Sequence, residues 1–213
     1  MVRANQLAYE YIRERIIDGT FRPSQHLVEV QLAEEIGVSR NTIKKVLLQL
    51  SEEKLVAIED NKGASVASLS IDEIQQYYEV RCSLEMIVVR SAASIISDED
   101  LDLLKSLYAE MLILKDNDDI DAYSAHNRMF HDVIYRASDK KIAVDMIRGI
   151  KNQMIRFQFR TMVVPGRADN SIKEHKALLE AMINHDPDAA VSAIQAHLVN
   201  VSATIVKYKS LFI

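Results

Sequence analysis

Glycine and proline are distributed very unevenly along this chain, and their distribution constrains its fold more than any other feature of the sequence. Gly19, Pro23, Gly37 and Gly63 fall in the first third of the 213 residues. Residues 64–148 contain neither residue type, which removes both strong helix breakers from 85 consecutive positions. We therefore expect short elements joined by turns in a first domain of residues 1–68, and long helices in a second domain of residues 69–213.

The composition is that of a globular protein. Hydrophobic residues make up 48% and charged residues 27% of the chain, which excludes a disordered chain. We find no run of apolar residues approaching the roughly 18–20 residues of a membrane span, so we expect no membrane partner. A single cysteine, Cys82, cannot form an internal disulfide, and a reducing cytoplasm is the expected location. Because the net charge is −5, any binding of nucleic acid must depend on a local basic surface.

Residues 1–68 are predicted to follow the order helix, short helix, turn, helix and hairpin. Gly37 is suited to end the short helix, and Ser39 is a natural N-cap for the helix that follows. Apolar spacing and turn chemistry predict two helices and two strands beside this third helix, over residues 7–18, 30–36, 55–59 and 64–68. This order is typical of a winged helix-turn-helix, which places a recognition helix in the major groove of DNA.

The helix that begins after Ser39 is basic, although the protein as a whole is acidic. Residues 36–51 contain Arg40, Lys44 and Lys45 and no acidic residue. Arg40 and Lys44 are four residues apart, so they share one face, and the positive end of the helix dipole lies beside them. Such a face also occurs on ordinary solvated helices, but within a winged helix-turn-helix it favours DNA binding.

Three stretches of this domain carry a resemblance to a known family: Ile12-Arg-Glu-Arg-Ile-Ile-Asp-Gly19, Leu32-Ala-Glu-Glu-Ile-Gly-Val-Ser-Arg40 and Leu55-Val56. They resemble the GntR family of bacterial transcription regulators. The resemblance implies that the recognition helix and the wing tip contact DNA through Ser39, Arg40, Asn41, Thr42, Lys44, Lys45, Lys62 and Gly63. A homodimer on a palindromic operator is expected, because one recognition helix reads only a half-site.

Residues 69–213 are expected to form an antiparallel all-α bundle, so that the whole chain is mainly α-helical. Capping boxes at Ser70–Glu73 and Ser171–Glu174, and the pair Asp186-Pro187, indicate where helices begin. The predicted helices have apolar stripes, and the short loops between them favour antiparallel neighbours. The six predicted helices span residues 71–96, 98–116, 119–137, 139–163, 170–184 and 187–209.

Two of the six histidines are predicted to lie level with each other. His175 and His197 each lie 11 residues from Asp186, at the turn between the last two helices. In an antiparallel pair both would therefore lie about 16 Å from the turn. Asn127 and His131 share one face of an earlier helix, because they are four residues apart. Metal sites in bundle cores are built from such sets, although a single histidine is more often an ordinary core or surface residue.

The same domain resembles the FCD ligand-binding domain of the FadR subfamily within GntR, and six helices place it nearer the VanR-like branch. The resemblance is carried by Arg81-Cys-Ser-Leu84-Glu85, Asn127-Arg-Met-Phe130-His131, Glu174-His175 and His197-Leu198. It implies a divalent metal held by Asn127, His131, His175 and His197, with Asn127 in place of the more usual Asp. Three neutral imidazoles suit Zn²⁺ or Ni²⁺.

The resemblance also implies an effector, a small organic acid that binds at the open position of the metal. Arg81 matches the family arginine of the first bundle helix and is a candidate anchor for the carboxylate of this acid. A simple pair with Glu85, four residues further on, is the alternative role for Arg81. Arg156 and Arg160 are weaker candidates for effector binding.

An enzyme is the main alternative. His131-Asp132 is the dipeptide of HD phosphohydrolases, which are also helical and use a metal held by His and Asp. Such an enzyme needs a further histidine well upstream, and in the bundle only His126 precedes the dipeptide, on an incompatible face. No phosphate-binding glycine loop or Ser-His-Asp order is visible either. We therefore expect a regulator and no enzyme. An adaptor without DNA contact would predict a neutral or acidic recognition helix, which the sequence does not have.

Overall fold

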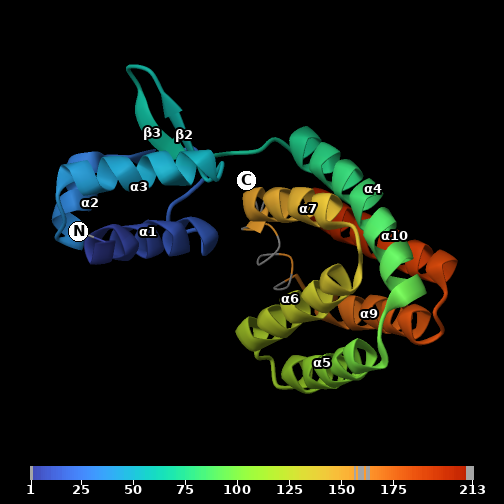
Figure 1. Ribbon diagram of the computed structural model, residues 1–213. Helices are drawn as coiled ribbons and strands as arrows, with labels where there is room; N and C mark the ends of the chain where they lie inside the picture. The colour runs from blue at the N-terminus through green and yellow to red at the C-terminus, as the bar shows by residue number, and fades with distance from the viewer. Residues whose placement is uncertain (1, 156, 158–160, 162–163, 210–213) are drawn as a thin grey trace. The chain divides into compact units, whose positions relative to one another are not determined.

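The computed structural model describes residues 2–155, 157, 161 and 164–209 (Figure 1). The chain divides into two compact units. The winged unit comprises the residues up to Ser70 together with a short segment that begins at Lys151. The helical unit comprises Ile71–Ile150 and continues from Phe157. Each unit has its own architecture.

The winged unit combines three helices with a small antiparallel sheet, as the sequence predicts. Its elements are α1 (Val2–Ile17), β1 (His26–Leu27), α2 (Glu29–Ile36), α3 (Arg40–Glu52), β2 (Val56–Glu59) and β3 (Gly63–Val66). The strand order is β1-β3-β2, and β2 and β3 form a hairpin that projects beyond α3 (Figure 1). The predicted winged helix-turn-helix is therefore confirmed.

The turn residues of the winged unit have the predicted roles. Gly37 ends α2 with a φ of 75°, a left-handed conformation that glycine adopts at little cost. The Ser39 side chain caps α3 by accepting a hydrogen bond of 3.1 Å from the backbone N–H of Thr42. Strand β1, in which His26 pairs with Ser65, was not predicted from the sequence. A strand of two residues has no alternation of polar and apolar side chains that a periodicity argument could detect.

The core of the winged unit is apolar. It is made of the inward faces of the three helices and the strands, namely Ala8, Ile12, Ile16, Leu27, Leu32, Ala33, Ile43, Val46, Leu47, Leu50, Leu55, Val56 and Val66. The stripe predicted on the third helix, at Ile43, Val46, Leu47 and Leu50, is buried. This packing leaves the polar face of α3 in solvent.

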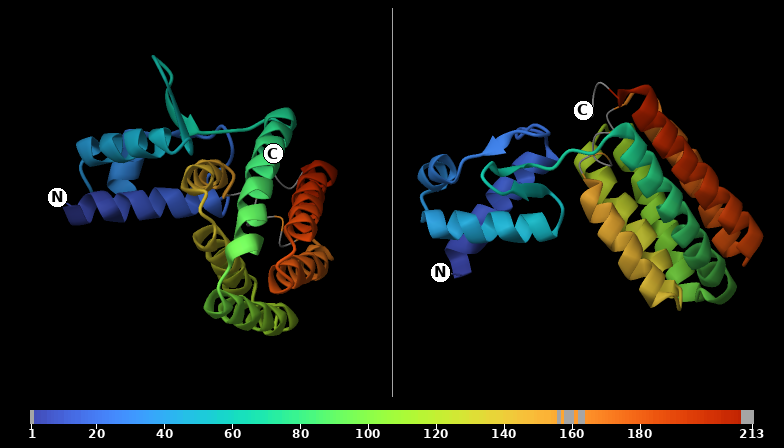
Figure 2. Two further views of the ribbon diagram at one scale, coloured as in Figure 1. Left: turned by 45° about the vertical axis from the view of Figure 1, so that its right-hand side comes forward. Right: turned by 90° about the horizontal axis from the view of Figure 1, so that it is seen from above.

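The helical unit is an all-α bundle of antiparallel helices, which confirms the predicted class (Figure 2). Its described helices are α4 (Ile71–Ile95), α5 (Asp98–Asp116), α6 (Ile120–Ala137), α7 (Lys141–Gln153), α9 (Arg167–Ile183) and α10 (Pro187–Lys207). Helix α10 packs along α4 and α9, while α6 packs against α4 and α5. Side chains of α4, α6, α9 and α10 therefore meet in the interior of the bundle.

Two predicted helix boundaries were wrong. The helix expected over residues 139–163 ends at Gln153, and several of the residues that follow lie outside the described ones. The helix expected from residue 170 begins at Arg167, with Gly166 at its N-cap position. Ser171 is therefore inside α9 and is no N-cap. Its side chain instead accepts a hydrogen bond of 2.9 Å from the hydroxyl of Tyr123.

Helix α10 corrects the expectation that no apolar stretch approaches the length of a membrane span. Among the described residues, it is the one helix that is long and apolar enough to cross a membrane by length and composition. However, α10 packs along α4 and α9 and carries the buried His197. The core helix of a bundle meets the same criteria of length and composition, and we assign α10 to the bundle for this reason.

Candidate functional site

The recognition helix α3 presents most of its predicted DNA-contacting side chains to solvent. Arg40, Asn41, Lys44 and Lys45 are exposed, because the opposite face of α3 fills the core. The Arg40 guanidinium lies 3.8 Å from the Glu29 carboxylate, and such an exposed pair is weak enough to exchange for a phosphate or a base.

The N-terminal end of α3 holds two further predicted residues. The hydroxyls of Ser39 and Thr42 lie 2.9 Å apart, so both side chains hold the end of the helix in addition to any contact with DNA. The free backbone N–H groups at this end favour an anion such as a phosphate.

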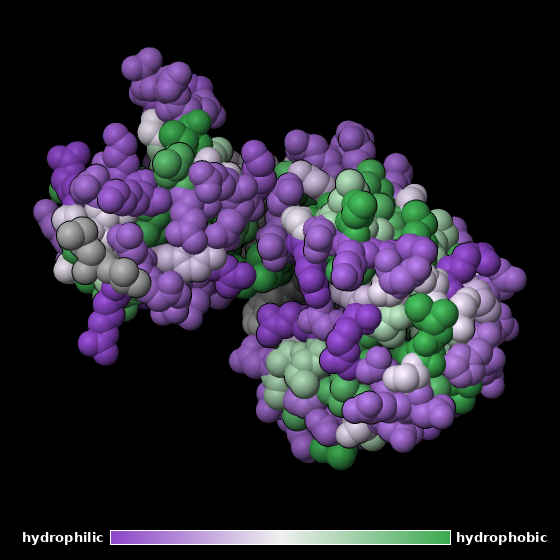
Figure 3. Space-filling model, viewed as in Figure 1, coloured by the Kyte–Doolittle hydropathy of each residue, from purple (hydrophilic) through white to green (hydrophobic). Residues whose placement is uncertain are grey.

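The wing tip carries the other predicted contacts, Lys62 and Gly63. Gly63 has a φ of 82° and pairs with Glu59 at the end of the hairpin. The Lys62 ammonium lies 2.7 Å from the Glu59 carboxylate, and its side chain is 72% exposed. Figure 3 shows the tip of the hairpin as hydrophilic. An exposed cation at the end of a projecting hairpin is the arrangement that a minor-groove contact requires.

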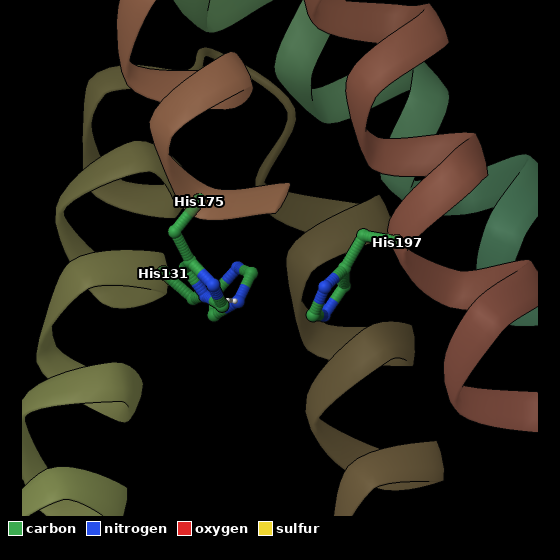
Figure 4. Close-up of side chains that lie close together, drawn as sticks. All are labelled: His131, His175 and His197. Atoms are coloured by element: carbon green, nitrogen blue, oxygen red, sulfur yellow. Dashed lines mark hydrogen bonds between the residues drawn. The ribbon is translucent and has the colours of Figure 1, made fainter. Parts of the chain in front are cut away.

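Three of the four predicted metal ligands meet inside the helical unit. His131 on α6, His175 on α9 and His197 on α10 point toward one another (Figure 4). One potential ligand atom from each lies within 4.8 Å of the others, and all three residues are buried. The Nε2 atoms of His131 and His175 are 3.1 Å apart. The ring centroids of His175 and His197 are 5.0 Å apart, which confirms that these two residues are level with each other.

The outer nitrogens of two of these imidazoles are held by hydrogen bonds. His175 Nδ1 lies 2.6 Å from the backbone carbonyl oxygen of Ser171, and His197 Nδ1 lies 2.7 Å from a carboxylate oxygen of Glu174. Because both partners only accept, each Nδ1 carries the proton and donates it. In the neutral rings Nε2 then keeps its lone pair. Carboxylate and carbonyl partners fix metal-binding histidines in this way.

The pKa values of this cluster favour neutral imidazoles beside a charged carboxylate. Burial, together with the neighbouring His197, lowers the pKa of His175 to about 3. Burial also lowers the pKa of His197, although the hydrogen bond with Glu174 opposes the change. Burial opposes ionisation of Glu174, but His197 and Arg167 hold the pKa of its carboxyl at about 2. Neutral imidazole is the form that binds a metal.

The residues present fit a divalent metal. The side-chain oxygen of Asn127, one turn before His131 on α6, is buried and has no hydrogen-bond partner among the described residues. Such an atom calls for an explanation, because buried polar atoms are nearly always partnered. Two nitrogens on one tetrahedral zinc lie about 3.4 Å apart, near the 3.1 Å between His131 and His175. The donor set of three imidazoles and one amide oxygen therefore suits Zn²⁺ or Ni²⁺.

Arg81, the predicted carboxylate anchor, forms the pair that was its alternative role. Its Nε donates to a carboxylate oxygen of Glu85 at 3.0 Å, and both side chains are buried. The same oxygen accepts a hydrogen bond of 2.6 Å from the hydroxyl of Tyr135. Arg81 is thus held within the polar interior by its own helix. The other two candidates, Arg156 and Arg160, lie outside the described residues.

The sequence analysis did not identify Arg167 and Glu174 as site residues. Arg167 donates from Nη2 to Glu174 at 2.8 Å, and the same carboxylate oxygen binds His197. Asn200 donates to the other oxygen of Glu174 at 2.9 Å. A signal for Glu174 was present, because a histidine ligand usually has a carboxylate partner and Glu174 precedes His175. No pattern in the sequence indicated Arg167, whose partner Glu174 lies seven residues further along the same helix.

Family comparisons agree with this geometry. The family model described as "Bacterial regulatory proteins, gntR family" matches residues 5–66, and the model described as "FCD domain" matches residues 76–200. The chain belongs to the GntR family. Its second unit is an FCD domain, and the resemblance stated from the sequence is confirmed.

Curated relatives of this GntR-family chain are transcriptional regulators. The uncharacterized HTH-type transcriptional regulator YdhC of Bacillus subtilis is 26% identical over 89% of this chain and 85% of its own length. The gluconate operon transcriptional repressor of Bacillus subtilis is 30% identical over 75% of this chain and 65% of its own length. The solved structure of E. coli McbR/YncC has the same fold, with a TM-score of 0.76 at 20% identity, covering 98% of this chain and 100% of that one.

The family and the geometry both exclude the enzyme alternative. The matched family and the curated relatives are transcriptional regulators, so the prediction of no enzyme is confirmed. Asp132, the second residue of the HD dipeptide, is more than half exposed and lies 4.0 Å from Arg148. Its carboxylate is therefore no partner of His131 in a hydrolase site.

Proposed function

We propose that this GntR-family regulator binds a palindromic operator as a homodimer, and that a small organic acid controls its operator affinity. The acid binds beside a divalent metal in the helical unit. The observation that carries the proposal is the convergence of His131, His175 and His197 in the buried interior of the bundle. Because its target is DNA, the regulator works in the cytoplasm and has no membrane partner.

The proposed metal is Zn²⁺ or Ni²⁺, held by His131, His175, His197 and the side-chain oxygen of Asn127. When bound, it supplies a Lewis-acid centre that attracts a carboxylate. The chain contributes orientation: Glu174 and the backbone of α9 hold the proton on Nδ1 of His197 and His175, so that Nε2 of each neutral ring carries the lone pair that would bind the metal. The amide of Asn127 brings no negative charge, so affinity for the metal is lower than with an aspartate.

Elemental analysis of the purified full-length protein tests the metal. We expect Zn²⁺ or Ni²⁺ in the wild type and its loss in His175→Ala and His197→Ala. His185→Ala, outside the cluster, is the matched control and keeps the metal. Asn127→Asp raises the affinity by adding a charged ligand. A metal-free wild type that shows no thermal shift on addition of Zn²⁺ would rule out the metal.

Fluorescence anisotropy at fixed salt tests the assignment of the recognition helix. Arg40→Ala should weaken binding to the specific operator by about 1–3 kcal/mol if Arg40 contacts a base. Arg136→Ala, an exposed arginine of the helical unit, is the control. Unchanged operator affinity in Arg40→Ala would remove this residue from the DNA-reading face. Size-exclusion chromatography with light scattering tests the homodimer, and a monomer at micromolar concentration would contradict it.

Calorimetric titration with and without operator tests the control of DNA binding. Helix α4, which carries Arg81, begins at Ile71, soon after β3 ends at Val66, so a shift of α4 passes to the wing through a few residues. A coupling of about 1–3 kcal/mol gives a 5–150-fold change in operator affinity, and operator must change acid affinity by the same factor. Gluconate is the first acid to test. Equal acid affinity with and without operator would remove allostery from the proposal.

A further inference from the structure

Arg167 has more hydrogen-bonding capacity than its surroundings use. Its side chain is 3% exposed, and its Nη2 donates to Glu174 at 2.8 Å. Its Nε and Nη1 are buried and have no hydrogen-bond partner in the described part of the chain. A guanidinium has five N–H donors, and leaving them unpaired in a buried position is unfavourable. The unpaired donors therefore indicate an acceptor that the described residues do not supply.

Tyr78 on α4 also has a buried hydrogen-bond donor that is not used. Its hydroxyl is buried and has no hydrogen-bond partner among the residues that the structure describes. The two side chains come from α4 and α9, which contact each other. Burial raises the pKa of Tyr78, and the charges of Arg81 and Arg167 oppose the increase. No hydrogen bond joins Tyr78 to Arg167, although each has unused donors. An acceptor group that reaches both side chains would satisfy both.

The pair of Arg167 and Tyr78 is distinct from the three-histidine centre, which is formed by His131, His175 and His197. Hydrogen bonds join Arg167 to His197 through the Glu174 carboxylate, on the Nδ1 side of the imidazole ring. The nitrogen that faces His131 and His175 lies on the other side of that ring. Arg81 is less suited to this second role, because its Nε is bound to Glu85. The interior of the helical unit therefore holds two places for an anionic group.

The charges of the interior are consistent with two such groups. Arg81–Glu85 and Arg167–Glu174 are each neutral as buried ion pairs, with 5% or less of each arginine side chain exposed. A divalent metal at the three-histidine centre would add two positive charges to this interior. Buried charges are stable only when they are balanced by a partner. Two carboxylates would balance a divalent metal.

We propose that Arg167 and Tyr78 form a second anchoring point that binds a carboxylate of the effector other than the one at the three-histidine centre. The inference rests on the proposed function and specifies its ligand. The effector class is a dicarboxylic acid, or an acid with a second acceptor group at a similar distance. A monocarboxylic acid of the same length occupies the three-histidine centre alone and binds more weakly.

Calorimetry on the full-length, Zn²⁺-loaded protein tests the anchoring point with length-matched acids: malonate with propionate, succinate with butyrate, and glutarate with valerate. In at least one pair we expect the diacid to bind about 10–100-fold more tightly, the range of hydrogen bonds to a charged group. Arg167→Met abolishes this preference. Tyr78→Phe reduces it about 5-fold. Arg136→Met, on the exposed arginine of α6, retains it.

The two variants separate ligand binding from support of the metal centre. Arg167→Met also removes a partner of Glu174, so Zn²⁺ affinity is measured in every variant, whereas Tyr78→Phe leaves Glu174 untouched. The anchoring point is overturned if no diacid binds more tightly than its partner, or if the preference survives in both variants. If the preference holds but no acid changes operator affinity, the proposed function fails and the anchoring point stands.

Discussion

The two units of this regulator have interiors of opposite character. Among the described residues, the winged unit buries apolar side chains and no polar or charged one. The helical unit buries Arg81, Glu85, Ser138, Thr161, Arg167, Ser171 and three histidines. Burial of polar groups is unfavourable unless each is paired, so the two interiors differ in what they contribute to stability. The winged unit presents its predicted DNA contacts on its surface, whereas the metal and effector site proposed for the helical unit lies in its core.

The largest expected effect concerns the buried pair of Arg81 and Glu85. Arg81→Met leaves the Glu85 carboxylate in the core with only the hydroxyl of Tyr135 and should destabilise the helical unit by about 3–5 kcal/mol. The double variant Arg81→Met with Glu85→Leu replaces the pair by apolar groups and should be as stable as the wild type or more stable. Urea denaturation measures both. A double variant as unstable as the single one would show that the polar interior is itself a source of stability.

A second effect concerns the carboxylate behind His197. Glu174→Gln removes the charge that orients this imidazole and balances Arg167, so affinity for Zn²⁺ should fall about 10–100-fold. Glu180→Gln, an exposed residue of the same helix, is the control. Competition with a fluorescent zinc chelator measures the affinity. Equal affinities in the two variants would remove Glu174 from the support of the metal centre.

Lowering the pH should destabilise the helical unit and leave the winged unit largely unaffected. The pKa of His175 is about 3 in the folded chain and about 6.5 when unfolded. Between these values only the unfolded chain binds the proton, so stability is complete above pH 6.5 and falls as the pH decreases toward 3. At pH 5 the loss is about 2 kcal/mol. The Glu174 carboxyl, with a pKa of about 2, adds a loss only below its unfolded value near pH 4.3.

Hydrogen exchange with mass spectrometry on the metal-free protein measures this difference, after correction for the intrinsic exchange rates. Amides of α9 and α10 should lose protection between pH 7 and pH 5, and amides of α3 should not. His175→Asn, which removes the imidazole with the strongly lowered pKa, should reduce the change; the pKa of His197 is also lowered by burial, so part of the change remains. Equal losses of protection in both units would contradict the assignment to the buried histidine.

The smallest expected effect is at the surface of the winged unit. Lys62→Ala removes an exposed ion pair with Glu59, which contributes little to stability. If Lys62 contacts a phosphate, the variant should bind all DNA sequences more weakly and lower the salt dependence of binding by about one charge. Lys105→Ala, an exposed lysine of the helical unit, is the control. A loss confined to one operator sequence would indicate that Lys62 reads a base.

The fold was predictable from the sequence where the signals are local. The turn at Gly37, the cap at Ser39 and the start of α4 after Ser70 depend on neighbouring residues, and the structure agrees with them. Ser171 shows where a local signal is insufficient. Its spacing to Glu174 fits a capping box, but α9 begins one turn earlier and the side chain instead bonds to Tyr123.

The part of the candidate site that depends on residue spacing along helices was predictable from the sequence. Equal distances of His175 and His197 from the turn at Asp186 were enough to place the two rings side by side. The contact of Arg167 with Glu174 was not predicted, because α9 was expected to begin at residue 170 and Arg167 lay before that start. The pair with Glu85 was foreseen as one of two roles for Arg81, since spacing alone does not decide between an intrahelical partner and a ligand.

The burial of the three-histidine centre should make the entry and exit of its ligands slow. His131, His175 and His197 are 4%, 1% and 8% exposed, so a metal or an acid reaches them only when the bundle opens. Openings of packed helices are rare and slow compared with diffusion, and they limit the rates of both entry and exit. For an effector that binds there as proposed, the residence time would be set by the motion of the helices. The regulator would then respond to the supply of effector averaged over the interval between openings, and not to shorter fluctuations.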